Sequence, residues 1–342
     1  MILREINKKG FDDIKLKLNV SENRINWESY FNQYKNVLFY LARNQNPLGA
    51  RYISLLFIFR HTVELFLKKR LTTIELSHSI NELFNKTENL PSDFLKQLEI
   101  LKCEGDGSDF RYYRNKEGKT YFNNEIINIK APIEYFLDIC GLNVILTGKH
   151  KGHFNIYANY NTIGQIATDY DESMCLIIDG IIQKKLSINE VYLPLIFIIR
   201  HSIELSLKQN LIVAGQNYLS DNDISNILQE HSIAKLFHKF EMIINIALNN
   251  MSKKGDENVQ NFKKETEEYQ QKLNSLQSLI QNLDSNSYFY RFPIDRNGNS
   301  YNLTLNERKI IELLKLRLEV DAYLTFAIPV LQEYGYLEYC YE

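Results

Sequence analysis

Two stretches of the chain place hydrophobic and polar residues with the spacing of amphipathic helices. They read WESYFNQYKNVLFYLAR at 27–43 and IGQIATDYDESMCLIIDGIIQ at 163–183. A second helical pattern follows each of them, at 51–71 and at 191–211. These later helices are apolar nearly all round in their first two turns, which predicts that each is the central, buried helix of its surroundings.

The two central helices contain the same motif. Residues 51–71 read RYISLLFIFRHTVELFLKKRL, and residues 191–211 read VYLPLIFIIRHSIELSLKQNL. Two further matches follow in the same order. HSINELF at 78–84 matches HSIAKLF at 231–237, and FRYYRNKEG at 110–118 matches YRFPIDRNG at 290–298. Because the three matches are collinear, they predict an internal duplication.

The duplication predicts two helical modules, at 25–148 and 162–342, which follow an unassigned leader at 1–24. The stretch 149–161 has no helical period and is expected to be the linker. A charged stretch at about 251–285 is expected to be a solvated helical insertion in the second module.

The FRYYRNKEG block and its match alternate aromatic and polar residues about a glycine, which predicts a short β-hairpin in each module. The expected fold class is therefore mainly α. It comprises two tandem helical bundles of one topology, each with a short β-hairpin, packed together as an intramolecular pseudo-dimer.

Composition agrees with helices and excludes several classes of protein. The 342 residues include 44% hydrophobic residues but only 14 glycines and 6 prolines, which disfavours a fold built on many tight turns. The 4 cysteines form no CxxC pair, so a zinc ribbon is excluded, and a dense disulfide framework is disfavoured. No apolar run approaches a membrane span, and the start has no signal-peptide core. A cytoplasmic protein without membrane contact is expected.

Charge and motifs narrow the functional classes. The 40 Lys and Arg residues nearly balance 42 Asp and Glu, so nucleic-acid binding by overall phosphate neutralisation is disfavoured, while binding through a local patch stays open. The chain has no GxGxxG, GxxxxGK[ST], GxSxG or HExxH motif. No cofactor is therefore predicted.

The repeated motif places charged residues on one helix face. Arg60, Glu64 and Lys68 are four residues apart, and His61 precedes Glu64 by three. Because Glu64 follows an apolar run, it is expected to be withdrawn from water and to need Lys68 or Arg111 as a partner. Its equivalent in the second module would need Lys208 or Arg291. The candidate catalytic residues are His61, Glu64, His201 and Glu204, and the candidate ligand-binding residues are Arg60, Lys68, His78, Arg111, Arg200, Lys208, His231 and Arg291.

Two interpretations of this cluster are open. In the first, it is a structural network that pins a hairpin onto the central helix. In the second, it is a polar pocket for a phosphate or a base, with His61 as acid or base and Lys68 or Arg111 on the anion. The set His61, Glu64 and His78 matches no known metal signature, so no metal site is predicted.

The Arg-His-x-x-Glu-Leu-x-Leu-Lys helix, the His-Ser-Ile helix start and the aromatic-Arg block together resemble HEPN-like domains. The resemblance covers residues of about 25–148 and 162–335. It implies helical bundles that act on or bind RNA or nucleotides in bacterial defence or a toxin–antitoxin setting. It also implies a protein partner such as an antitoxin, and it is compatible with a homo-oligomer.

One departure from that family matters. Its ribonucleases carry Arg, four to six residues, then His, and no pair here fits, the nearest being Arg70 and His78 with seven residues between them. In these ribonucleases the site forms where two domains meet, which tandem copies could reproduce. The alternative function is a non-catalytic helical binding or scaffold protein in which the Arg-His-x-x-Glu cluster is structural.

Overall fold

A computed structural model describes most of the chain. The described residues are 26–44, 52–105, 108–112, 114, 118–148, 154–158, 162–215, 219–283, 290–295, 297–301, 312, 314, 317 and 332. The leader at 1–24 and almost all of residues 302–342 lie outside them. The described residues are mainly helical, with a small two-stranded sheet among them, which confirms the predicted fold class at this level.

The chain divides into two compact units. The first contains residues 1–199 and 288–304, and the second contains residues 200–287 and 305–342. This division falls inside helix α7 (Tyr192–Gly215), whereas the sequence repeats place a module boundary at 149–161. The compact units follow spatial contacts and the modules follow the repeated motifs, so the module bounds stay a prediction.

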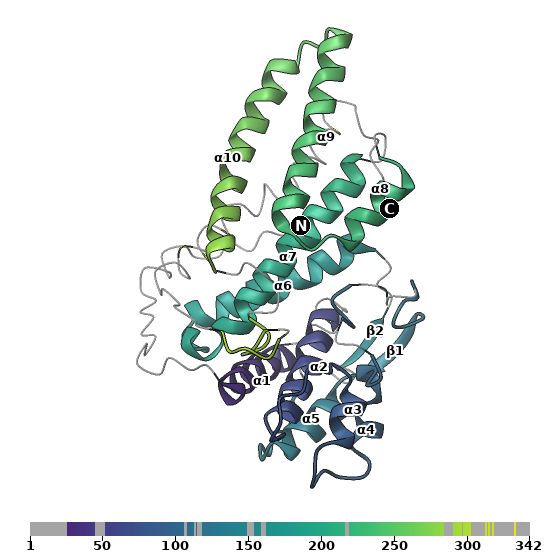
Figure 1. Cartoon of the computed structure of the whole chain (residues 1–342), viewed down its shortest axis with the longest axis vertical. Coiled ribbons are helices and arrows are strands. Elements are labelled where there is room, and N and C mark those ends of the chain that lie inside the picture. The colour runs from purple at the N-terminus through teal and green to yellow at the C-terminus, as the bar shows by residue number, and fades with distance from the viewer. Residues whose placement is uncertain are drawn as a thin grey trace. The chain divides into compact units, whose positions relative to one another are not determined.

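Three helices form the centre of the first unit (Figure 1). Helices α1 (Trp27–Arg43) and α6 (Ile163–Ile182) both pack against α2 (Tyr52–Lys68) and against each other. Every side chain of α2 is buried, as expected for the central helix. The Asn26 side chain caps α1, and a Thr162–Gln165 capping box begins α6.

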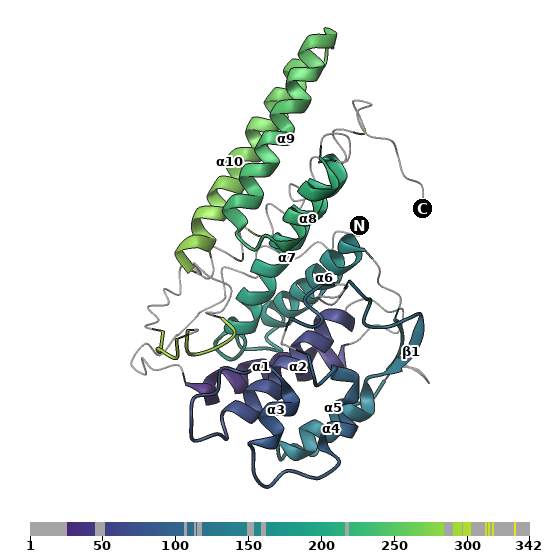
Figure 2. The same cartoon turned by 45° about the vertical axis from the view of Figure 1, so that its right-hand side comes forward.

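Shorter elements complete the first unit (Figure 2). They are α3 (Ile80–Asn85), α4 (Phe94–Gln97), the 3-10 turn η2 (Glu99–Leu101), α5 (Lys130–Ile139) and the 3-10 turn η3 (Ile188–Glu190). Strand β1 (Glu125–Asn128) pairs antiparallel with β2 (Asn155–Ala158). The second strand lies in the predicted linker, where four residues are too few to show a recognisable period.

The predicted hairpins are present in reduced form. Arg114 bridges Thr120 in the first block, and Ile294 bridges Ser300 in the second. Each turn contains a glycine at positive φ, Gly118 at 77° and Gly298 at 84°, a conformation that glycine adopts without a steric cost. Each block is therefore a turn closed by one isolated bridge, with no extended strand pair among its described residues.

The second unit continues from α7 into α8 (Asp221–Gln229), α9 (Ile233–Lys254) and α10 (Val259–Leu283). Helix α9 ends at Gly255 in the left-handed conformation, and α10 then packs beside it (Figures 1 and 2). Helix α10 covers most of the predicted charged insertion.

None of the helices described here has both the length and the apolar character needed to cross a bilayer.

Candidate functional site

The first candidate site is a buried set of charges around Glu64, which we call the Glu64 cluster: Arg60, His61, Glu64 and Lys68 of α2, with His78 before α3. Glu64 is only 1% exposed. Its Oε1 lies 2.9 Å from Lys68 Nζ and 2.7 Å from His78 Nδ1. Its Oε2 lies 3.6 Å from His61 Nδ1 and 3.9 Å from Arg60 Nη1. The expected Glu64–Lys68 ion pair is confirmed.

Arg60 connects this cluster to two loops. Its Nη2 donates to the carbonyl oxygens of His78, at 3.1 Å, and Gly105, at 2.5 Å. Its Nε lies 3.6 Å from Asp109 Oδ2. A Cβ atom at position 105 would lie 1.6 Å from that same carboxylate oxygen, so only glycine fits there without a rearrangement. Gly105 and Asp109 were not among the predicted residues, because neither has a counterpart in the matching segments of the second repeat.

Aromatic rings enclose His61 on several sides. The ring stacks on Phe57 with centroids 5.7 Å apart, and it meets Tyr34 and Phe292 edge-on at 4.6 Å and 4.8 Å. Its Nε2 lies 2.9 Å from the carbonyl oxygen of Arg291. Because a carbonyl oxygen only accepts, Nε2 carries the proton of this hydrogen bond.

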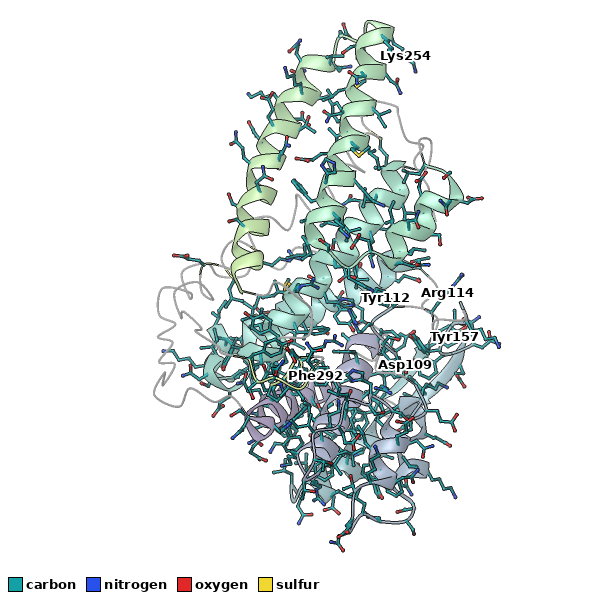
Figure 3. All side chains as sticks on the ribbon, in the orientation of Figure 1. Asp109, Tyr112, Arg114, Tyr157, Lys254 and Phe292 are labelled. Carbon is teal, nitrogen blue, oxygen red and sulfur yellow. The ribbon has the colours of Figure 1, made fainter. Side chains whose placement is uncertain are left out.

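The block at 290–301 therefore packs against the first motif helix, although it belongs to the second sequence repeat. Figure 3 labels Phe292, whose ring centroid lies 4.7 Å from Lys68 Nζ; the Trp27 ring lies 5.8 Å from the same nitrogen. The Arg291 guanidinium lies over the rings of Phe197 and Phe292, at 5.7 Å and 5.4 Å. Arg291, expected as an alternative partner for Glu204, thus contributes its carbonyl oxygen to the Glu64 cluster.

Arg111, the other candidate arginine, lies in the first unit and is buried. Its guanidinium carbon lies 5.5 Å from the centroid of the Tyr112 ring. The carbonyl oxygen of the preceding residue, Phe110, accepts a hydrogen bond of 2.9 Å from the hydroxyl of Tyr170 in α6. The FRYYRNKEG block is thereby attached to α6, the opening helix of the other repeat.

The second unit contains the equivalent set, the Glu204 cluster: Arg200, His201, Glu204, Lys208 and His231. Glu204 Oε1 lies 3.0 Å from both Lys208 Nζ and His231 Nδ1, which confirms the expected Glu204–Lys208 pair. Its Oε2 lies 3.4 Å from Arg200 Nη1 and 3.9 Å from His201 Nδ1. Arg200 Nη2 donates to the carbonyl of His231 at 3.0 Å, as Arg60 does to that of His78.

The charges within each cluster control its protonation. Burial by itself raises the pKa of Glu64. Lys68, His61 and His78 together lower this pKa by more than burial raises it, so the net pKa lies well below the ordinary value of 4.5. The pKa of Glu204 is lowered in the same way against its burial, chiefly by Lys208. Burial lowers the pKa of His61 below the ordinary value of 6.5 despite the nearby carboxylate. At neutral pH the carboxylates are ionised and His61 is neutral.

These shifts predict that the protein loses stability as the pH falls. Below pH 6.5 the unfolded chain binds a proton at His61 before the folded chain does, and below 4.5 the same holds for Glu64. Both groups therefore favour unfolding as the solution is acidified. Urea unfolding midpoints measured at pH 7.5, 6 and 4.5 should decrease in that order. In His61→Phe the decrease between pH 7.5 and 6 should be smaller, and an unchanged slope would contradict this assignment.

Neither cluster is open to a substrate. His61 and Glu64 are 3% and 1% exposed, and His201 and Glu204 are 1% and 0% exposed. The histidines at the edge are more accessible, with side-chain exposures of 27% for His78 and 51% for His231. Among the described residues, no three His, Cys, Asp or Glu side chains are grouped so as to hold a metal ion. A reaction at His61 would require the surrounding aromatic residues to move.

No family model, no curated protein and no solved structure matches this chain.

Proposed function

We propose that the chain is a duplicated, HEPN-like helical protein that binds RNA or nucleotides without cleaving them, in a bacterial defence or toxin–antitoxin setting. The observation that carries the non-catalytic part is the closure of both clusters. Each central carboxylate is at most 1% exposed and is paired with a lysine and histidines. Removing one member of such a buried, paired set destabilises the fold, and a carboxylate satisfied in this way offers no group to a ligand in bulk water.

The duplication is supported by a residue that meets its own equivalent. Phe57 and Phe197 both stand three positions before the motif arginine. Their rings stack with centroids 4.8 Å apart and an interplanar angle of 19°. A residue touches its own equivalent where a twofold axis relates two copies, so this pair fits the proposed pseudo-dimer.

Reciprocal hydrogen bonds between the repeats support the same arrangement. Gln33 is the seventh residue of α1 and accepts from the backbone N–H of Leu193 at 2.9 Å. Asp169 is the seventh residue of α6 and accepts from the N–H groups of Ile53 and Ser54, both at 2.9 Å. Ile53 and Leu193 each precede the motif arginine by seven positions. Each opening helix therefore holds the start of the central helix of the other repeat.

The tyrosine that follows each of these residues also contacts the other repeat. Tyr34 is the eighth residue of α1, and its hydroxyl donates to the carbonyl of Tyr290 at 2.9 Å. Tyr170 is the eighth residue of α6, and its hydroxyl donates to the carbonyl of Phe110 at 2.9 Å. Phe110 and Tyr290 begin the two matching hairpin blocks. The exchange of hairpins between repeats agrees with two copies that pack as an isologous pair.

The ligand class follows from the resemblance to HEPN-like domains. The near balance of 40 basic and 42 acidic residues argues against long-range attraction of a polynucleotide, so binding would use a local site. The missing Arg-x-x-x-x-His spacing and the enclosed histidines both favour binding over cleavage. A non-catalytic scaffold with no nucleotide ligand is the competing function.

The test is to incubate the purified chain with total cellular RNA, with and without a chelator, and to measure binding of a labelled oligoribonucleotide and of mononucleotides. We expect binding and intact RNA. Cleavage by the wild type that is lost in a folded His61→Gln/His201→Gln variant, and kept in the exposed control His238→Gln, would establish a nuclease instead. No binding of either ligand would favour the scaffold.

A further inference from the structure

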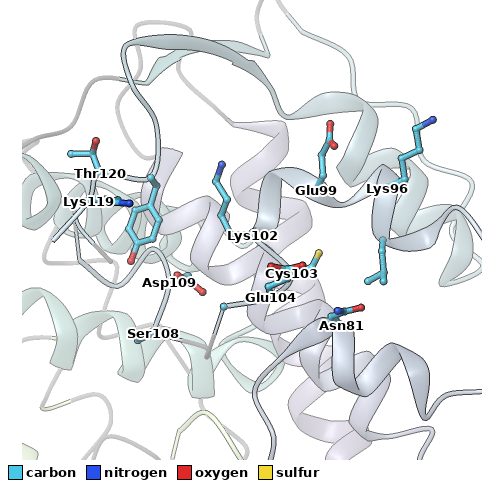
Figure 4. A pocket seen from close by; sticks show the side chains of 13 residues that line it. Asn81, Lys96, Glu99, Lys102, Cys103, Glu104, Ser108, Asp109, Lys119 and Thr120 are labelled. Carbon is cyan, nitrogen blue, oxygen red and sulfur yellow. The ribbon is translucent and has the colours of Figure 1, made fainter. Parts of the chain in front are cut away.

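The charged clusters leave two surface features of the first unit without a role. One is a pocket of about 1010 Å³ beside α4, η2 and the loop that follows η2 (Figure 4). Lysine and carboxylate side chains both line it, and Figure 4 shows Lys96 on one side of Glu99 and Lys102 on the other, so its charges select no single class of ligand. The other feature is the outer edge of strand β1, whose backbone groups match those of an extended polypeptide.

The hydrogen bonding of the sheet shows which groups face this edge. Strand β1 pairs antiparallel with β2, with Ile126 opposite Tyr157, and the Ile129 N–H donates to the carbonyl of Phe154 at 3.1 Å. In an antiparallel ladder, pairs that exchange backbone hydrogen bonds alternate with pairs that do not. Ile126 stands three positions before Ile129 and therefore belongs to a pair without such bonds. Its N–H and C=O groups point away from β2.

These groups of Ile126 are open to a further strand. Within the part of the chain that the structure describes, the Ile126 backbone forms no hydrogen bond, and the sheet has no third strand. The Ile126 side chain is 72% exposed, and Tyr157 directly opposite is 52% exposed. Residues that are directly opposite lie on the same face of a sheet. A strand edge with open backbone groups and an exposed apolar pair is a template for pairing with another chain.

We propose that a second copy of this chain pairs antiparallel with β1 along this edge, about a twofold axis through Ile126. The N–H of each Ile126 donates to the C=O of the other, and the two sheets join into one of four strands. On one face, Tyr157 and Ile126 of one copy continue into Ile126 and Tyr157 of the other. This interface is independent of nucleotide or RNA binding.

The residues of β1 favour a second copy as the occupant. The twofold axis brings the most exposed apolar side chain of the sheet against its own equivalent, which is the geometry of an isologous interface. Glu125 is the only charged residue of β1, and this register places it opposite Ile127 of the other copy. No two like charges are then directly opposite, an arrangement that would be destabilising. The edge is therefore self-complementary in both its backbone and its side chains.

The small size of this edge limits the strength of the dimer. Stable complexes bring about 20–30 residues of each partner into contact, whereas β1 has four residues. We therefore expect a weak dimer that is populated at high protein concentration and dissociates on dilution.

Sedimentation velocity of the full chain over a range of concentrations tests the proposal. We expect the wild type to shift from monomer to dimer as the concentration rises. Ile126→Lys places a lysine against its own equivalent, and it should weaken dimerisation by at least about tenfold. The matched control is Ile74→Lys, at a position outside the sheet that is 59% exposed, and it should dimerise as the wild type does. Circular dichroism establishes that each variant is folded.

A charge exchange tests the twofold register itself. Ile126→Glu should also be monomeric alone, because two glutamates would then be opposite each other. An equimolar mixture of Ile126→Lys and Ile126→Glu should recover a dimer, since each lysine would meet a glutamate. A wild type that stays monomeric at every concentration would overturn the proposal, as would an Ile126→Lys variant that dimerises normally. A mixture that stays monomeric would show that Ile126 does not meet its own equivalent, which also overturns the proposed pairing.

Discussion

Replacing Glu64 by alanine is expected to lower the free energy of unfolding by about 3–5 kcal/mol, the largest effect of any single substitution considered. Glu64 is 1% exposed and is the only carboxylate within 3 Å of Lys68 Nζ among the ion pairs of the described residues. Its removal would leave Lys68 buried with its positive charge uncompensated, and it would remove the acceptor of His78. Chemical unfolding monitored by circular dichroism measures the change.

Glu28→Ala is the matched control for this prediction. Glu28 also pairs with a lysine, at 2.8 Å from Lys69 Nζ, but its side chain is 56% exposed. An exposed pair of this kind contributes at most about 1 kcal/mol. If Glu64→Ala and Glu28→Ala lower the free energy of unfolding equally, the buried pair contributes no more to stability than the exposed pair does. The structural interpretation of the cluster would then be wrong. Glu64→Gln should fall between the two, since it keeps the shape and removes the charge.

Replacing Asp169 by alanine is expected to cost about 3 kcal/mol, because one buried carboxylate holds the start of α2. Asp169 is 1% exposed, and it accepts from the N–H groups of Ile53 and Ser54 and from the Ser54 hydroxyl. The first N–H groups of a helix have no partner within the helix, and a negative charge at that end also interacts with the helix dipole. Losing this carboxylate removes a charged acceptor from two buried N–H groups at once.

Gln33→Ala tests the equivalent contact in the other repeat. Gln33 accepts one hydrogen bond, from Leu193 N–H at 2.9 Å, and it is neutral. A single neutral hydrogen bond contributes about 1 kcal/mol, so this substitution should cost about a third as much. Equal losses from Asp169→Ala and Gln33→Ala would show that the charge at the start of α2 adds nothing. Both values come from the same urea titrations at neutral pH.

Local spacing predicted the contacts that form within one helix. Glu64 and Lys68 are one turn apart, as are Glu204 and Lys208, and residues at this spacing lie side by side on any α-helix. The apolar run before the motif also predicted correctly that α2 is buried. His78 was a candidate because its His-Ser-Ile helix start recurs, and the structure places its Nδ1 2.7 Å from Glu64. These results depend on helix geometry and repetition, which a single sequence contains.

Contacts between distant segments could not be assigned in this way. The order of the repeats made Arg111 the expected alternative partner of Glu64. The hairpin-block residue whose carbonyl contacts His61 is instead Arg291, which is 230 residues from His61 in the chain. The pairing of β1 with β2 and the contacts of Arg60 with Gly105 and Asp109 were likewise not predicted. Each involves short segments whose own residues form no periodic pattern.

The sequence alone therefore determined the helical class, the buried motif helices and the Glu–Lys pair at the centre of each charged cluster. Only the tertiary structure decided that the clusters are enclosed and which hairpin block covers the first of them. The physical reason is that helix spacing is a local property, whereas burial depends on every segment that packs against a surface. The sequence shows Glu64 beside Lys68, but it does not show that Phe292 lies over that lysine and Arg291 against His61.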